Sequence, residues 1–115
     1  MLLLDEPALP VHSLGRANVE LHCDDAARFL EQQPAGSFSG FTLSNILDGA
    51  NAVYARRLAV AVSRAAAPDA RVVLRSFREP FVNGPTNRAV DDRAMVWGIV
   101  HVFSPAQFEA EAARW

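Results

Sequence analysis

The sequence contains no lysine, since all eleven basic residues among its 115 residues are arginines. This absence excludes a lysine Schiff base, a lysine general base and the lysine of a Walker-type phosphate loop. Cysteine is nearly absent as well. Cys23 is the only one, and a single thiol cannot form a disulfide within the chain. We therefore expect a reducing compartment.

Long apolar runs are also missing. No stretch approaches the roughly 18 apolar residues that a membrane-spanning helix needs. The N-terminal run Met1–Leu4 is followed by two acids and lacks the basic region of a signal peptide. We predict no membrane span and a cytoplasmic location. The formal net charge of −2 argues against a protein that binds nucleic acid through bulk electrostatics.

The pattern of apolar residues predicts alternating strands and helices. Half of the residues are hydrophobic, and the length fits one domain. We divide the chain into an irregular N-terminal arm (residues 1–18) and an α/β domain (residues 19–115). Strands are predicted at residues 19–23, 38–43, 71–77 and 95–103, and helices at 24–33, 52–67 and from 105 onward. This alternation favours right-handed crossovers and a mainly parallel sheet flanked by helices.

Two helix starts carry clear capping signals. Asn51 precedes the helix of residues 52–67, and Ser104-Pro105-Ala106-Gln107 has the pattern of a capping box with proline at the first helical position. Within the predicted strands, Cys23 is expected to be a small core residue. His101 is expected to be half-buried and hydrogen-bonded.

Polar residues follow three of the predicted strands. They are Asp24-Asp25, the segment 44–48 and the segment 75–78. In parallel α/β sheets, ligands bind beyond the carboxyl ends of the strands, so these residues are candidates for a binding site.

The runs 19–26, 38–48 and 66–75 resemble the third, fourth and fifth strands, with their loops, of class I S-adenosylmethionine-dependent methyltransferases. More narrowly, residues 43–48, 73–75 and 92–98 are similar to the enzymes that move the 3-amino-3-carboxypropyl group of S-adenosylmethionine onto diacylglycerol. The resemblance implies a partial Rossmann-like, methyltransferase-type fold. It implies S-adenosylmethionine as the cofactor and methyl or 3-amino-3-carboxypropyl transfer as the reaction.

The resemblance also implies roles for individual residues. Asp25 would accept a hydrogen bond from the adenine amino group, and the backbone N–H of Ala26 would face a ring nitrogen. Ser44 and Asn45 would complete the cofactor-binding set. Asp48, Arg75 and Arg78 would bind the substrate, because short polar side chains and planar guanidinium groups suit polar or anionic groups. No catalytic residue is implied.

The sequence departs from the family in two ways. Asp69 stands where the family turn usually has glycine after proline, and no G-x-G-x-G loop occurs. The family's first two strands have no room before Val19, so we expect an incomplete transferase. Its partner would be a second copy, as in a homo-oligomeric dimer, or a complementary N-terminal polypeptide.

Each candidate residue also has a purely structural interpretation. Asp24 or Asp25 could cap a helix, Ser44, Asn45 and Asp48 could form turns, and Arg75 or Arg78 could form an ion pair. No metal site is predicted, because side chains alternate along a strand and His22 and Cys23 would point to opposite faces. The alternative function is a non-catalytic, methyltransferase-like protein that acts through self-association.

Overall fold

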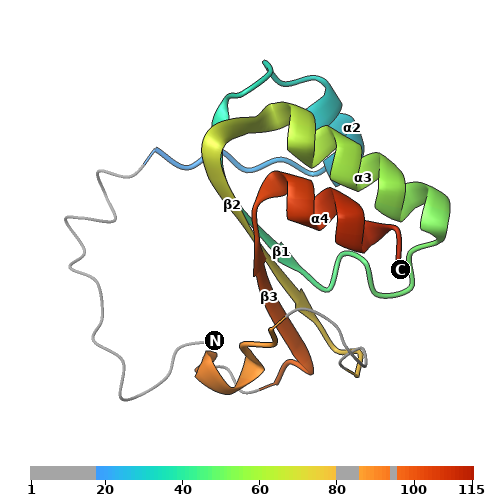
Figure 1. Ribbon diagram of the computed structural model, residues 1–115. Coiled ribbons are helices and arrows are strands. Elements are labelled where there is room, and N and C mark those ends of the chain that lie inside the picture. The colour runs from blue at the N-terminus through green and yellow to red at the C-terminus, as the bar shows by residue number, and fades with distance from the viewer. Residues whose placement is uncertain (1–17, 80–85, 94–95) are drawn as a thin grey trace.

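The computed structural model describes residues 18–79, 86–93 and 96–115. Their elements follow the order α2 (Ala26–Glu31), β1 (Phe38–Ser44), α3 (Ala52–Ala65), β2 (Ala66–Ser76), η1 (Ala89–Asp91), β3 (Ile99–Phe103) and α4 (Pro105–Ala112). The three strands form one sheet in the order β1-β2-β3, and helices α2, α3 and α4 pack beside it (Figure 1). The α/β class predicted from the sequence is confirmed.

The sheet is mixed rather than mainly parallel. β1 and β2 run parallel, with Ser44 beside Arg75 at their carboxyl ends. β3 runs antiparallel to β2, and Ile99 pairs with Ser76. The sequence prediction was right for the first pair and wrong for β3. It failed there because β2 and β3 are joined by a segment of more than 20 residues in which the described part contains only a 3-10 turn, whereas a parallel crossover in such folds usually contains a helix.

The core lies between the helices and one face of the sheet. Alternate residues of a strand face the same side, and Val72, Leu74 and Phe103 therefore share the helix-covered face. The buried apolar residues that meet there include Ala27, Leu30, Leu47, Ala55, Leu58, Val62, Val72, Leu74, Phe103, Phe108 and Ala112. Within the described residues no helix covers the opposite face, where Thr42 and Ser44 of β1 and Val102 of β3 are exposed.

Two helix starts are as predicted. The Asn51 side chain accepts a hydrogen bond from the Tyr54 backbone N–H at 2.8 Å. Ser104 and Gln107 form the reciprocal capping box, with Pro105 at the first position of α4. α3 ends at Ala65, two residues before the predicted end, and Ala66 is extended. Proline disfavours the helical conformation of the residue before it, so the turn ahead of Pro68 opens early.

The predicted strand at residues 19–23 is absent. These residues form no regular structure, and Val19 and Leu21 are 72% and 92% exposed. The alternation of apolar and polar residues did not predict a strand here, because this segment neither pairs with a strand nor packs into the core. Cys23 is exposed, so its expected place in the core is also wrong. Met95 of the predicted 95–103 strand lies outside the described residues, and of its described residues 96–103 only Ile99–Phe103 form a strand.

Candidate functional site

The carboxyl ends of β1 and β2 bring several predicted site residues to one edge of the sheet. Ser44 ends β1 beside Arg75 in the parallel register. The backbone N–H of Asn45 donates to the carbonyl oxygen of Arg75 at 2.8 Å and so extends the ladder by one bond. Asn45 has a φ of 45°, a left-handed conformation that asparagine tolerates better than most residues. The chain therefore turns sharply away from the sheet at Asn45.

Asp48 ties the loop after β1 to the end of β2. One carboxylate oxygen, Oδ1, accepts from the Ser76 hydroxyl, and the other, Oδ2, accepts from the Phe77 backbone N–H at 3.0 Å. The Ser76 hydroxyl oxygen in turn accepts from the Arg78 backbone N–H at 3.0 Å. Ser76 is 1% exposed, so its hydroxyl is screened from water, whereas Phe77 is 59% exposed. Asp48 thus has a structural function at the edge that was predicted to bind substrate.

The two arginines that were predicted to bind substrate also contact groups of the chain itself. Arg75 donates from Nε to the Asp92 carboxylate at 2.7 Å, and the side chains are only 26% and 11% exposed. This ion pair ties the segment after η1 to β2. The Arg78 guanidinium lies over the Trp115 ring, 4.6 Å from its centroid, and joins the end of β2 to the C-terminal residue by a cation–π contact.

Asp25 lies at the start of α2 and contacts the first turn of α3. It is the N-cap of α2, and its Oδ1 accepts from the Arg28 backbone N–H at 3.0 Å. The same oxygen accepts from the Tyr54 hydroxyl of α3 at 3.3 Å. The bond from Arg28, followed by the weaker one from Tyr54, holds the pKa of Asp25 below its usual value. Its exposed carboxylate is therefore an ionised acceptor, and Ala26 follows it as the first residue of α2.

The structure thus groups the predicted residues into two sets. Ser44, Asn45, Asp48 and Arg75 meet at the carboxyl edge of the sheet through the contacts above. Asp25 makes its contacts elsewhere, with the Arg28 backbone N–H of α2 and with the hydroxyl of Tyr54 in the first turn of α3. Capping and ion pairing, the structural alternatives for these residues, are observed at Asp25 and Arg75.

The residues His22 and Cys23 lie before α2 in an exposed segment. The His22 ring packs against Phe29, with centroids 4.6 Å apart, and its Nε2 lies 3.8 Å from Glu20. Within the described residues, no group of three or more histidine, cysteine or acidic side chains is arranged to hold a metal ion. The same described residues include no helix with the length and apolar character to cross a membrane.

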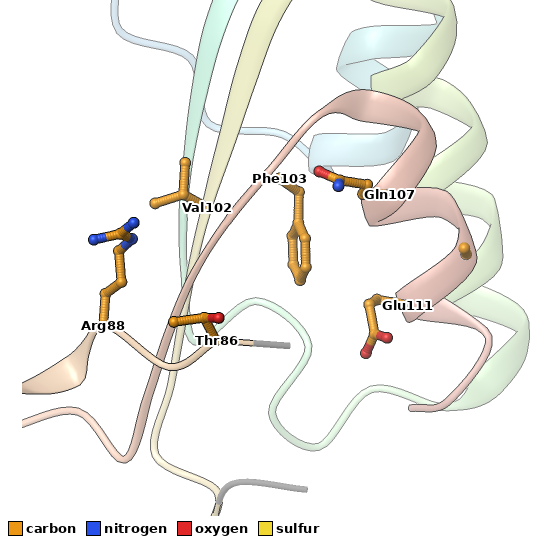
Figure 2. A pocket seen from close by; sticks show the side chains of 7 residues that line it. Thr86, Arg88, Val102, Phe103, Gln107 and Glu111 are labelled. Atoms are coloured by element: carbon orange, nitrogen blue, oxygen red, sulfur yellow. The ribbon is translucent and has the colours of Figure 1, made fainter. Parts of the chain in front are cut away.

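A pocket that the sequence did not predict lies between β3 and α4. It has a volume of about 720 Å³ and is lined by Thr86, Arg88, Val102, Phe103, Gln107, Ala110 and Glu111. Figure 2 shows Gln107 and Glu111 reaching toward it from α4, with Phe103 between that helix and the strand. The sequence carried one signal for it: Gln107 and Glu111 are four residues apart and share a helix face, whereas Phe108 and Ala112 form the buried one.

A second, smaller pocket of about 400 Å³ lies on the outer side of α3. Its walls include Val53 and Val60, which are 78% and 50% exposed, and the ion pair of Arg57 with Glu31 at 2.6 Å. Neither pocket is lined by a residue that the sequence assigned to the cofactor or the substrate.

The chain was compared with known proteins in three ways. No family model, no curated protein and no solved structure matches it. A proposal of function therefore rests on the positions and contacts of the site residues.

Proposed function

We propose that the chain forms one side of the cofactor site of an S-adenosylmethionine-dependent transferase that moves a methyl or a 3-amino-3-carboxypropyl group. The observation that carries the proposal is the parallel β1–β2 pair. Its register puts Ser44, Asn45 and Arg75 at one carboxyl edge, the position at which open α/β sheets bind ligands. The Rossmann-like fold is part of the same proposal.

The residues that the sequence assigned to the cofactor, Asp25 at the start of α2 and Ser44 and Asn45 at this edge, fit its polar groups. The ionised Asp25 carboxylate is exposed and suits an amino group as donor. Ser44 and Asn45 are also exposed, and their side chains can both donate and accept. When bound, S-adenosylmethionine supplies a sulfonium leaving group beside the carbon that is attacked. The residues of this chain would bind and orient it and help to exclude water.

Calorimetric titration with S-adenosylmethionine and S-adenosylhomocysteine tests this function. We expect a saturable heat with the wild-type chain and a weaker one with Asp25→Asn, which retains a helix-capping side chain but loses the charge. Asp24→Asn is the matched control, because it removes the same charge one residue earlier. A folded wild-type sample that gives no heat with either compound would refute cofactor binding by this chain.

The outer edge of β1 supports a second candidate, a non-catalytic protein that self-associates. β2 pairs with only one side of β1. The N–H of Asn45 points toward β2, and N–H groups alternate along a strand, so those of Gly40, Thr42 and Ser44 point to the other side. Within the described residues no strand pairs with this side, and unpaired edges readily pair with another chain. A symmetric dimer would close it.

Light scattering over a range of concentrations tests the second candidate. Thr42→Pro removes an N–H on the outer side of β1 and leaves the bonds to β2 in place. We expect a wild-type dimer, a monomeric Thr42→Pro variant, and an unchanged dimer for Thr42→Val, which keeps the N–H. A wild-type chain that stays monomeric at the highest concentration refutes self-association and leaves the result of the cofactor titration unaffected.

A further inference from the structure

The outer side of β3 forms the other edge of the sheet, opposite that of β1. The N–H of Val100 donates to the Asn87 side chain at 2.9 Å, and its C=O accepts from the Arg88 N–H at 2.7 Å, so both groups point away from β2. His101 pairs with β2 and is 2% exposed, so it is buried rather than half-buried as the sequence predicted. Because these directions alternate, the N–H and C=O of Val102 point outward again. Within the described residues no group is hydrogen-bonded to them there, so this part of the edge can pair with another strand.

The pocket between β3 and α4 lies along this part of the edge. Val102 and Phe103 both line it, and neighbouring residues of a strand face opposite sides of the sheet. Figure 2 shows Val102 and Arg88 on one side of β3, and Phe103, Gln107 and Glu111 on the other. The pocket therefore extends around the edge of β3, and its volume of about 720 Å³ falls within the range of ligand sites.

The two sides of this pocket favour different side chains on an added strand. A residue opposite Val102 would share its face of the sheet, where the Arg88 side chain is 59% exposed and lies 3.8 Å from Asp91. An acidic side chain suits that position. The residues before and after it would face α4, where Phe103 and Ala110 supply apolar surface. The pocket thus fits an extended segment with the sequence apolar–acidic–apolar.

The chain itself contains such a segment at residues 19–21. Val19, Glu20 and Leu21 belong to the predicted strand that forms no regular structure. Val19 and Leu21 are 72% and 92% exposed, and the Glu20 side chain is 78% exposed. In an extended conformation the two apolar side chains lie on one side and the acidic one on the other. Exposed apolar side chains that share one side of a segment favour contact with another surface.

The segment 19–21 lies outside the pocket of its own chain. Its apolar side chains are exposed, and none of its residues lines the pocket. The next residue, His22, packs against Phe29 of α2 with ring centroids 4.6 Å apart, and Asp25 caps the same helix. The segment is therefore attached to α2 and projects from the molecule, which suits contact with a second copy.

We propose that residues 19–21 of one copy add as a fourth strand to the outer edge of β3 in a second copy. Glu20 pairs with Val102 and faces Arg88, while its two apolar neighbours pack against Phe103. Main-chain hydrogen bonds and pockets for alternate side chains are the features that hold added strands in other proteins. Reciprocal exchange fills both pockets and closes a symmetric dimer. This interface differs from the outer edge of β1 and includes no residue of the proposed cofactor site.

A synthetic peptide of residues 18–22, blocked at both ends, tests the pocket by amide NMR of the isotope-labelled chain. We expect saturable shifts that centre on Val102 and residues 107–111. A Glu20→Lys peptide should bind about tenfold more weakly or worse, because it places a like charge beside Arg88. A peptide methylated on the Glu20 nitrogen should not bind, because it lacks the N–H that pairs with Val102. Equal binding of the three peptides, or no saturable shift with the first, would overturn the proposal.

The exposed thiol of Cys23 tests whether a second copy is the occupant. A chain spin-labelled at Cys23 is mixed with an isotope-labelled Cys23→Ser chain, and we expect broadened amide signals at Val102 and residues 107–111. Leu21→Asp in the spin-labelled chain should abolish the broadening. Val90→Asp is the matched control, because Val90 is 90% exposed and does not line the pocket. Absence of broadening at these residues would refute the exchange, and this result is independent of the cofactor titration and of the Thr42 variants.

Discussion

The hydrogen bonds of Asp48 allow a quantitative test of what the carboxyl edge of the sheet does. If Asp48 mainly joins the loop after β1 to the end of β2, then Asp48→Ala removes two bonds to a carboxylate, from the Ser76 hydroxyl and the Phe77 backbone N–H. Each such bond is worth about 1.5–3 kcal/mol. Because the residue is half-buried rather than fully buried, we take the lower end and expect a loss of about 3 kcal/mol in the free energy of unfolding.

Two further variants divide this energy. Asp48→Asn keeps one acceptor oxygen and should lose roughly half as much as Asp48→Ala. Asp69→Ala removes an exposed carboxylate from β2 and should stay within about 0.5 kcal/mol of the wild type. In a double-mutant cycle, Asp48→Ala and Ser76→Ala should be non-additive by about 1–2 kcal/mol, since they share one hydrogen bond.

Urea denaturation followed by circular dichroism and by tryptophan fluorescence measures these values. Trp97 stacks on Phe77, with centroids 4.5 Å apart, so its emission reports on the end of β2 next to the Asp48 bonds. If Asp48→Ala were as stable as Asp69→Ala, the structural function of Asp48 would be refuted. Asp48 would then be available for the substrate-binding function that the sequence predicted.

Three other outcomes follow from burial and capping. Burial lowers the pKa of His101 from 6.5, so the unfolded chain binds a proton at this residue more readily than the folded chain does. The free energy of unfolding should therefore fall as the pH drops below about 6.5, and His101→Asn should make the melting temperature less dependent on pH over that window. A melting temperature that depends on pH equally in the variant and in the wild type would contradict this. Leu58→Ala should cost about 3 kcal/mol because Leu58 is fully buried, whereas Val60→Ala on the exposed side should cost well under that amount; chemical denaturation compares them. Ser104→Ala should lose about 1 kcal/mol with the capping box of α4, and a neutral result by the same assay would dismiss the contribution of the cap.

Local sequence signals predicted the helices because they depend on nearby residues. The stripe of Leu58, Val62 and Ala65 marked the buried face of α3, and all three are buried. Asn51 and Ser104 marked helix starts because a cap needs only a side chain and an N–H three residues on. The strands predicted at residues 38–43 and 71–77 are present in the structure, and their apolar residues pack in or against the core.

The candidate site could be predicted only in part. Residue types and strand ends placed Ser44, Asn45 and Arg75 together, and the parallel register agrees with that placement. The sequence left open which partners these side chains take. Asp92 is 17 residues from Arg75 and Ser76 is 28 residues from Asp48, and no local pattern pairs residues at such separations.

What the sequence by itself determined is therefore the identity of the helices and of two strands, because propensity, capping and periodicity act within a few residues. Tertiary structure alone decided the rest. It left residues 19–23 without a strand partner, turned β3 antiparallel to β2, and buried His101. Each of these outcomes depends on which distant surfaces meet, and that is fixed only when the sheet and helices pack as a whole.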